Sequence, residues 1–104
     1  VRIIRGAKCI VGVDNGLIHL AGLTDTPIVV GYSLRHPKYS LPIRHNELGW
    51  NCYVVEPDDK CRYCMTDWVL PVNADFRHCD NESFLCVKSL TVEKFIKKIE
   101  EVLR

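Results

Sequence analysis

Asp14, Asn15 and Gly16, with His19 three residues further on, are the first candidates for chemistry in this sequence. They follow an apolar, β-branched run at 8–13 and open a short stretch of helical character. Where a helix follows a parallel strand, its first N–H groups point in one direction and its dipole adds partial positive charge. Gly16 has no Cβ and permits close approach. The turn is therefore a candidate phosphate site, and the alternative is that Asp14 and Asn15 only cap the helix.

A second candidate is a group of cysteines between positions 61 and 86. These are Cys61, Cys64, Cys79 and Cys86. A Cys-x2-Cys pair with two later cysteines is typical of tetrahedral zinc or iron sites, although six residues separate the second pair, unlike a standard zinc ribbon. His78 could replace one ligand. Free thiols and two disulfides are the alternatives. Cys9 and Cys52 fall in apolar runs, and we expect them to be core thiols.

The elements that would position the first candidate form a strand–helix–strand unit. We expect strands at 8–13 and 28–32, with a short helix at 17–23 between them. Such an order is typical of a βαβ unit with a parallel sheet. An Asn-Gly turn could instead join a hairpin, but 17–23 does not alternate polar and apolar residues. A further strand is expected at 50–55.

Residues 33–49 show little apolar periodicity, and the sequence predicts a long loop there. Its basic residues are Arg35, His36, Lys38, Arg44 and His45. A solvated loop is the simplest interpretation of them.

The C-terminal segment, 91–103, is predicted to be an amphipathic helix. Its apolar residues fall on one face, which comprises Val92, Phe95, Ile96, Ile99, Val102 and Leu103. Thr91 is a suitable N-cap and Glu93 suits the first turn. The lysines and glutamates between them are interpreted as a solvated face.

Composition limits the function classes. The 104 residues carry 14 Lys and Arg against 13 Asp and Glu, so the formal net charge is +1. We expect no nucleic-acid binding from this balance. No apolar window reaches the ~18 residues of a membrane span and no signal peptide is visible, so a cytoplasmic location is expected. We expect one domain, 1–104, divided into a βαβ part (1–57), a cysteine finger (58–88) and a helical end (89–104).

The stretch from Val11 to Ala21, followed by Thr26 to Gly31, resembles the donor-site signature of glycosyltransferase family 9, the ADP-heptose:lipopolysaccharide heptosyltransferases. The family pattern runs strand, Asp-Ser/Thr-Gly-x-x-His-x-Ala, helix, then a Thr-Pro-led strand. The resemblance covers essentially the whole chain. It implies the GT-B fold, with two Rossmann-like domains and the nucleotide-sugar in the C-terminal one. The expected fold is thus α/β, a partial Rossmann-like GT-B C-terminal half with short parallel strands, a four-cysteine finger and a C-terminal amphipathic helix.

The resemblance also implies roles for single residues. Contacts to the donor diphosphate or its sugar are implied for Asn15, Gly16, Leu17 and His19, and for Arg35 in a loop that borders the donor pocket. Other basic residues of that loop could also neutralise phosphate charge. Asp14 would order the turn. Asn15 departs from the family, which usually has Ser or Thr there, although an amide can still donate.

Many family 9 members carry a Cys-x2-Cys with later cysteines before the last helix. One branch, which heptosylates bacterial autotransporter adhesins, has a four-cysteine iron finger there, and residues 84–91 are similar to its end. The resemblance thus implies a structural zinc or iron ion on Cys61, Cys64, Cys79 and Cys86.

The expected function is the nucleotide-sugar-binding half of a glycosyltransferase that transfers heptose or a similar sugar with inversion. The N-terminal acceptor domain, with the family's proposed general base, is not among these residues, so we expect this chain alone to be inactive. The alternatives are a small metal-stapled interaction module that has lost sugar transfer and a non-catalytic nucleotide sensor.

Overall fold

The computed structural model describes residues 1–33, 36–58 and 85–104. Its elements, in chain order, are α1 (Arg2–Gly6), β1 (Ile10–Val13), α2 (Gly16–Ala21), β2 (Ile28–Gly31), the 3-10 turn η1 (Pro37–Tyr39), β3 (Ile43–Arg44), β4 (Glu47–Leu48), β5 (Cys52–Val55), α3 (Leu85–Lys88) and α4 (Val92–Leu103). Most of the expected cysteine finger, 58–88, lies outside the described residues. Within the described ranges, no helix has the length and apolar character to cross a membrane.

Three parallel strands form the main sheet, in the order β1-β2-β5. Val11 pairs with Val29 and Val29 with Tyr53, so the three strands start and end at the same level. The expected βαβ unit is therefore confirmed, with a helix rather than a hairpin after Asn15. All four residues of the central strand β2 are buried, as its apolar composition requires. The fold is a small α/β domain.

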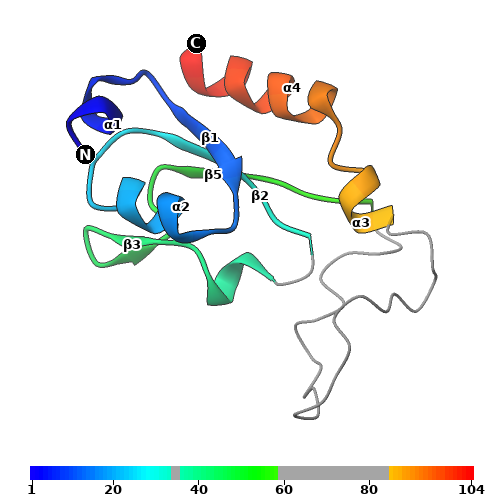
Figure 1. Ribbon diagram of the computed structural model, residues 1–104, viewed down its shortest axis with the longest axis horizontal. Helices are drawn as coiled ribbons and strands as arrows, with labels where there is room; N and C mark the ends of the chain where they lie inside the picture. The colour runs from blue at the N-terminus through cyan, green and yellow to red at the C-terminus, as the bar shows by residue number, and fades with distance from the viewer. Residues whose placement is uncertain (34–35, 59–84) are drawn as a thin grey trace.

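Helices cover the two faces of this sheet (Figure 1), with α2 on one face and α4 on the other. A Cβ at Gly12 of β1 would lie 3.1 Å from Ile18 of α2. A Cβ at Gly31 of β2 would lie 2.7 Å from Phe95 of α4, on the opposite face. The core under α2 is made by Ile18, Ala21, Ile28, Val30 and Tyr32.

The α4 helix forms as the sequence predicts. The Thr91 hydroxyl accepts a hydrogen bond from the N–H of Lys94 at 3.4 Å, which caps its first turn. The helix lies mainly over β5 and β2 and covers the same face of β1 less completely. Val11 and Val13 are therefore 46% and 51% exposed, although they belong to an all-apolar strand.

The segment 33–49 was expected to be a long loop, and that prediction is wrong for its second half. There β3 and β4 form a hairpin with a two-residue turn, in which Ile43 pairs with Leu48 and Arg44 with Glu47. The two turn residues, His45 and Asn46, have φ of 50° and 61°. Positive φ at both central positions is the geometry that matches the twist of paired strands. This hairpin was not predicted from the sequence, because its turn is not Asn-Gly and each of its strands is only two residues long.

Arg44 of β3 is buried, with 3% exposure, and its guanidinium donates hydrogen bonds to backbone carbonyls. These carbonyls belong to Ala21, Thr24, Thr26, Trp50 and Asn51. Arg44 thus ties the end of α2 to the segments that enter β2 and β5. A buried charge is tolerated when every donor finds an acceptor, and carbonyls near a helix C-terminus add favourable negative potential.

Candidate functional site

The carboxyl ends of β1, β2 and β5 meet at one edge of the sheet, where open α/β sheets bind ligands. The turn after β1 places Asn15 in extended backbone at the N-cap of α2. The Asn15 Oδ1 accepts hydrogen bonds from the N–H groups of Leu17 at 2.9 Å and Ile18 at 3.4 Å. The capping interpretation of Asn15 is thereby confirmed, and the backbone N–H of Leu17 is already engaged.

Two donors of this turn remain without a partner among the described residues. One is the Gly16 N–H, and the other is the side-chain amide Nδ2 of Asn15, because the cap uses only Oδ1. A Cβ built on Gly16 meets nothing within 4 Å, and Asn15 and Gly16 are both exposed, so solvent reaches the turn. An anion at this edge would therefore meet one backbone donor and one amide donor.

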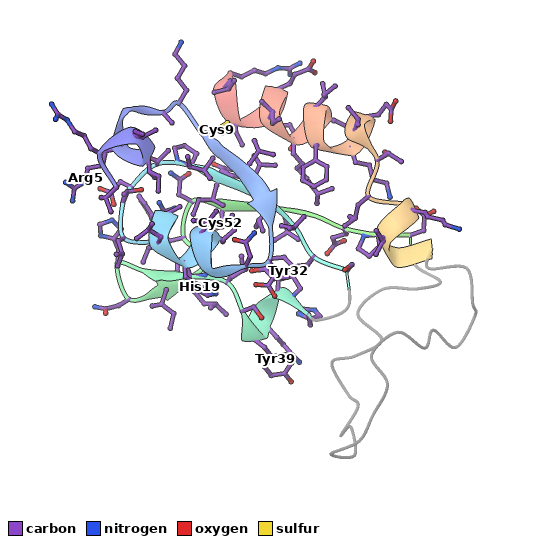
Figure 2. All side chains as sticks on the ribbon, viewed as in Figure 1. Arg5, Cys9, His19, Tyr32, Tyr39 and Cys52 are labelled. Carbon is purple, nitrogen blue, oxygen red and sulfur yellow. The ribbon has the colours of Figure 1, made fainter. Side chains whose placement is uncertain are left out.

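His19 is three residues beyond Gly16 and thus lies on the same face of α2. Its side chain is exposed, as are Asp14 and Leu17 (Figure 2 labels His19 on the helix). Asn15, Gly16, Leu17 and His19 are therefore brought together at the predicted place. Arg35, the fifth predicted contact, lies outside the described residues.

Arg44 and His45 do not border this edge, contrary to what the resemblance implied for the basic loop. The carbonyl partners of Arg44 in Thr24 and Trp50 lie before β2 and β5, at the amino ends of the strands. His45 Nε2 lies 2.8 Å from Asp25 Oδ1 at the same amino end. The β3–β4 hairpin, which was not predicted from the sequence, carries both residues there.

The residue that sequence reasoning overlooked near the candidate edge is Tyr32, which directly follows β2 (Figure 2). Its side chain is 1% exposed, and its hydroxyl has no hydrogen-bond partner within the described part of the chain. Burial raises the pKa of Tyr32 far above the ordinary 10.0, and the negative charges of Asp14 and of ionised Cys52 act in the same direction. Burial also raises the pKa of Cys52 above 9.0, and the Arg44 cation opposes part of that rise.

Substitution of Tyr32 by phenylalanine should leave the free energy of unfolding at pH 7 unchanged or raise it by about 1 kcal/mol, because the unpaired hydroxyl is desolvated on folding.

The raised pKa of Tyr32 also makes the stability of the natural chain depend on pH. The folded state holds the phenol proton more tightly, so this contribution is complete below pH 10.0 and is lost as the pH rises through the folded-state pKa. Above pH 10.0, the free energy of unfolding should therefore fall less in Tyr32→Phe than in the natural chain. Urea unfolding at several pH values would measure the difference. Tyr39→Phe, at an exposed tyrosine, is the matched control at pH 7. A loss above about 1 kcal/mol in Tyr32→Phe would mean that the hydroxyl has a partner.

Of the cysteines, the structure describes the side chains of Cys9 and Cys52. Both are free and half-buried, Cys9 before β1 and Cys52 at the start of β5, so they are less enclosed than the core thiols that we expected. The side chains of Cys61, Cys64, Cys79 and Cys86 lie outside the described residues, although the backbone of Cys86 belongs to α3. Among the described side chains, no group of three or more His, Cys, Asp or Glu residues is arranged to hold a metal.

Comparison of this chain with models of protein families, with curated proteins and with solved structures finds no match.

Proposed function

We propose that this chain is a nucleotide-sugar-binding domain of a glycosyltransferase, with the donor diphosphate held at the carboxyl edge of the sheet. The donor would be an ADP-heptose-like sugar nucleotide, as in family 9. One observation carries the proposal. The turn after β1 presents the Gly16 N–H and the Asn15 amide to open space, with the exposed His19 one helical turn further on.

The chain's own residues would then act on the leaving group. Charge builds up on the diphosphate as the sugar departs, and fixed N–H donors aimed at it stabilise that charge. Gly16 and Asn15 would supply such donors, and His19 would add a third contact to phosphate or sugar. The acceptor and the general base would come from a second domain, so we do not expect transfer from these residues alone.

The competing function is a small interaction module that has lost sugar chemistry. One observation favours it. The Asn15 cap engages the N–H groups of Leu17 and Ile18, so the turn offers an anion fewer backbone donors than an uncapped helix start. A substitution that tests the proposal must therefore keep the cap of α2 while it removes the side-chain amide donor of Asn15.

Asn15→Asp does so. An Asp carboxylate still caps α2 and suits the helix dipole, so stability should be kept within about 0.5 kcal/mol. The variant loses the amide donor and places a negative charge beside the phosphates. In NMR titrations with ADP, UDP and GDP at millimolar concentration, one nucleotide should selectively shift the amides of Asn15, Gly16, Leu17 and His19. Asn15→Asp should weaken that binding at least about tenfold, the loss of one charge-assisted hydrogen bond.

Asn15→Ser is the matched control, because serine also caps a helix and its hydroxyl still donates. It should bind within about threefold of the natural chain. The proposal would be contradicted by two results, namely no nucleotide-dependent shift at these amides in a folded sample, or equal binding by the Asp and Ser variants.

We also propose that Cys61, Cys64, Cys79 and Cys86 hold one structural zinc or iron ion, on the strength of their number and spacing. Elemental analysis of the purified chain should give about one metal ion per molecule, and Cys64→Ser should abolish it. Cys9→Ser is the control and should retain the metal, because Cys9 directly precedes β1 and lies far from the four cysteines in the sequence. Metal-free protein with native stability would reject the proposal.

A further inference from the structure

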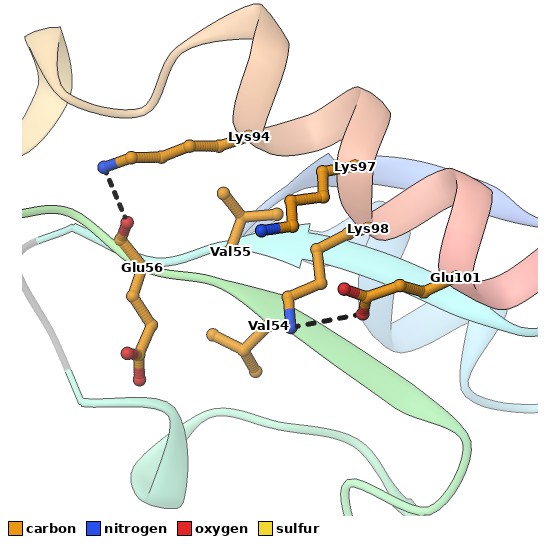
Figure 3. Close-up of a pocket in the computed structure, with 7 residues that line it drawn as sticks. All are labelled: Val54, Val55, Glu56, Lys94, Lys97, Lys98 and Glu101. Carbon is orange, nitrogen blue, oxygen red and sulfur yellow. Dashed lines mark hydrogen bonds and ion pairs between the residues drawn. The ribbon is translucent and has the colours of Figure 1, made fainter.

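A second surface lies along the outer edge of β5, under α4. It is a hollow of about 420 Å³, within the range of ligand sites, and is lined by Val54, Val55, Glu56, Lys94, Lys97, Lys98 and Glu101 (Figure 3). None of these residues belongs to the turn at Asn15. The hollow therefore needs an explanation other than the proposed donor site.

The first wall of the hollow is a strand edge. Tyr32 N–H donates to Val55 O, and Ile28 N–H donates to Asn51 O, so these carbonyls point towards β2. Backbone groups of successive strand residues alternate in direction, and the N–H and C=O of Val54 therefore point away from the sheet. Because β5 is an outer strand among the described elements, Val54 presents one donor and one acceptor to the hollow.

The second wall carries three lysines, one of which has no ion pair within the described part of the chain. Lys94 Nζ lies 3.0 Å from Asp58 Oδ1 and bonds to Glu56 O at 3.3 Å, while Lys98 Nζ lies 3.6 Å from Glu101 Oε2. The Lys97 side chain extends over Val55 between these two pairs (Figure 3), and it makes no ion pair with any residue that the structure describes. The residues that line the hollow therefore carry three positive charges, on Lys94, Lys97 and Lys98, against two negative charges, on Glu56 and Glu101.

We propose that this edge binds an extended, acidic segment of a partner polypeptide, which adds a strand to β5. The backbone of that segment pairs with the N–H and C=O of Val54, and one Glu or Asp side chain reaches Lys97. Strand addition gives affinity through the backbone and specificity through side chains. The simpler alternative is that the lysines only shield the edge from pairing, as charged side chains often do. A shielding role predicts no binding.

The probe is a seven-residue peptide of alternating valine and threonine with one central glutamate, titrated into the labelled chain. It should shift the amides of Val54, Val55 and Lys97 saturably and leave Gly16 unmoved, which separates this test from that of the proposed function. The same peptide with a central glutamine should bind about fivefold more weakly. A version N-methylated on the pairing edge should not bind, because it cannot donate to Val54 C=O.

Lys97→Gln should reduce affinity for the glutamate peptide about fivefold and should abolish its advantage over the glutamine peptide. Lys88→Gln, at an exposed lysine of α3, is the matched control and should change neither. Inorganic phosphate at the same concentration should leave Val54 unmoved. The proposal is overturned if the glutamate peptide causes no saturable shift, if the N-methylated peptide binds equally well, if phosphate reproduces the shifts, or if the shifts fall on β1 instead.

Discussion

Replacement of Arg44 by alanine should lower the free energy of unfolding by about 3–5 kcal/mol, because several buried carbonyls lose a donor and an unsatisfied buried acceptor costs about 1–3 kcal/mol. The substitution leaves carbonyls of Ala21, Thr24 and Thr26 without the donor that they share in the folded chain. Urea unfolding followed by circular dichroism would measure the loss. Because small domains have only about 5–15 kcal/mol in total, the variant should be close to unfolded at 37 °C.

Two further variants sharpen this prediction. Arg2→Ala, at an exposed arginine of α1, should change stability by no more than about 0.5 kcal/mol. Arg44→Lys keeps the positive charge but replaces the planar guanidinium, with its several donors, by a single ammonium. Its loss in free energy of unfolding should therefore lie between those of the other two variants. If Arg44→Ala costs under about 1 kcal/mol, the guanidinium does not join the end of α2 to the strands in the way we describe.

Gly31→Ala should cost about 1–3 kcal/mol, the usual range for an overpacked core. Its Cβ would lie 2.7 Å from Phe95 Cζ and 3.4 Å from Leu90 Cδ1, so α4 would have to move away from β2. Chemical denaturation would measure the loss. Gly16→Ala is the matched control, since nothing lies within 4 Å of its Cβ, and its stability should stay within about 0.5 kcal/mol.

A double-mutant cycle tests the cause. Phe95→Leu alone should destabilise by removing buried aromatic contacts, but in the Gly31→Ala background it should cost less, because the smaller side chain leaves room for the new methyl group. Strict additivity of the two changes would show that the cost at Gly31 comes from the backbone rather than from the contact with Phe95.

Sequence reasoning predicted the elements whose signals are local. The parallel unit around Asn15 and the cap at Thr91 depend on patterns within a few residues, and the structure has both. It failed for Arg44, because a basic residue in a polar stretch gives no sign that its guanidinium is buried. That burial depends on carbonyls about 20 residues earlier, which only the folded chain brings near.

In the candidate site, too, the residues with a local sequence signal were predicted and those that depend on distant contacts were not. The sequence placed Asn15, Gly16 and His19 together because they share one turn and one helix. It did not identify Tyr32, since an aromatic residue after an apolar strand usually signals packing, and only three-dimensional structure shows a hydroxyl without a partner. The cationic hollow at β5 was also missed, because Lys94, Lys97 and Lys98 have the spacing of an ordinary solvated helix face.

Among the strands that the structure describes, β1 and β5 are the outer ones, and they differ in a way that bears on the solution behaviour of the protein. Lysines line the hollow at the outer edge of β5, whereas β1 contains no charged residue and no proline, and its Val11 and Val13 are about half exposed. Natural edge strands usually carry such residues as protection against pairing with other chains. In concentrated solution, β1 is therefore where aggregation should begin. A lysine in place of Val11 would be the first change for anyone preparing concentrated samples.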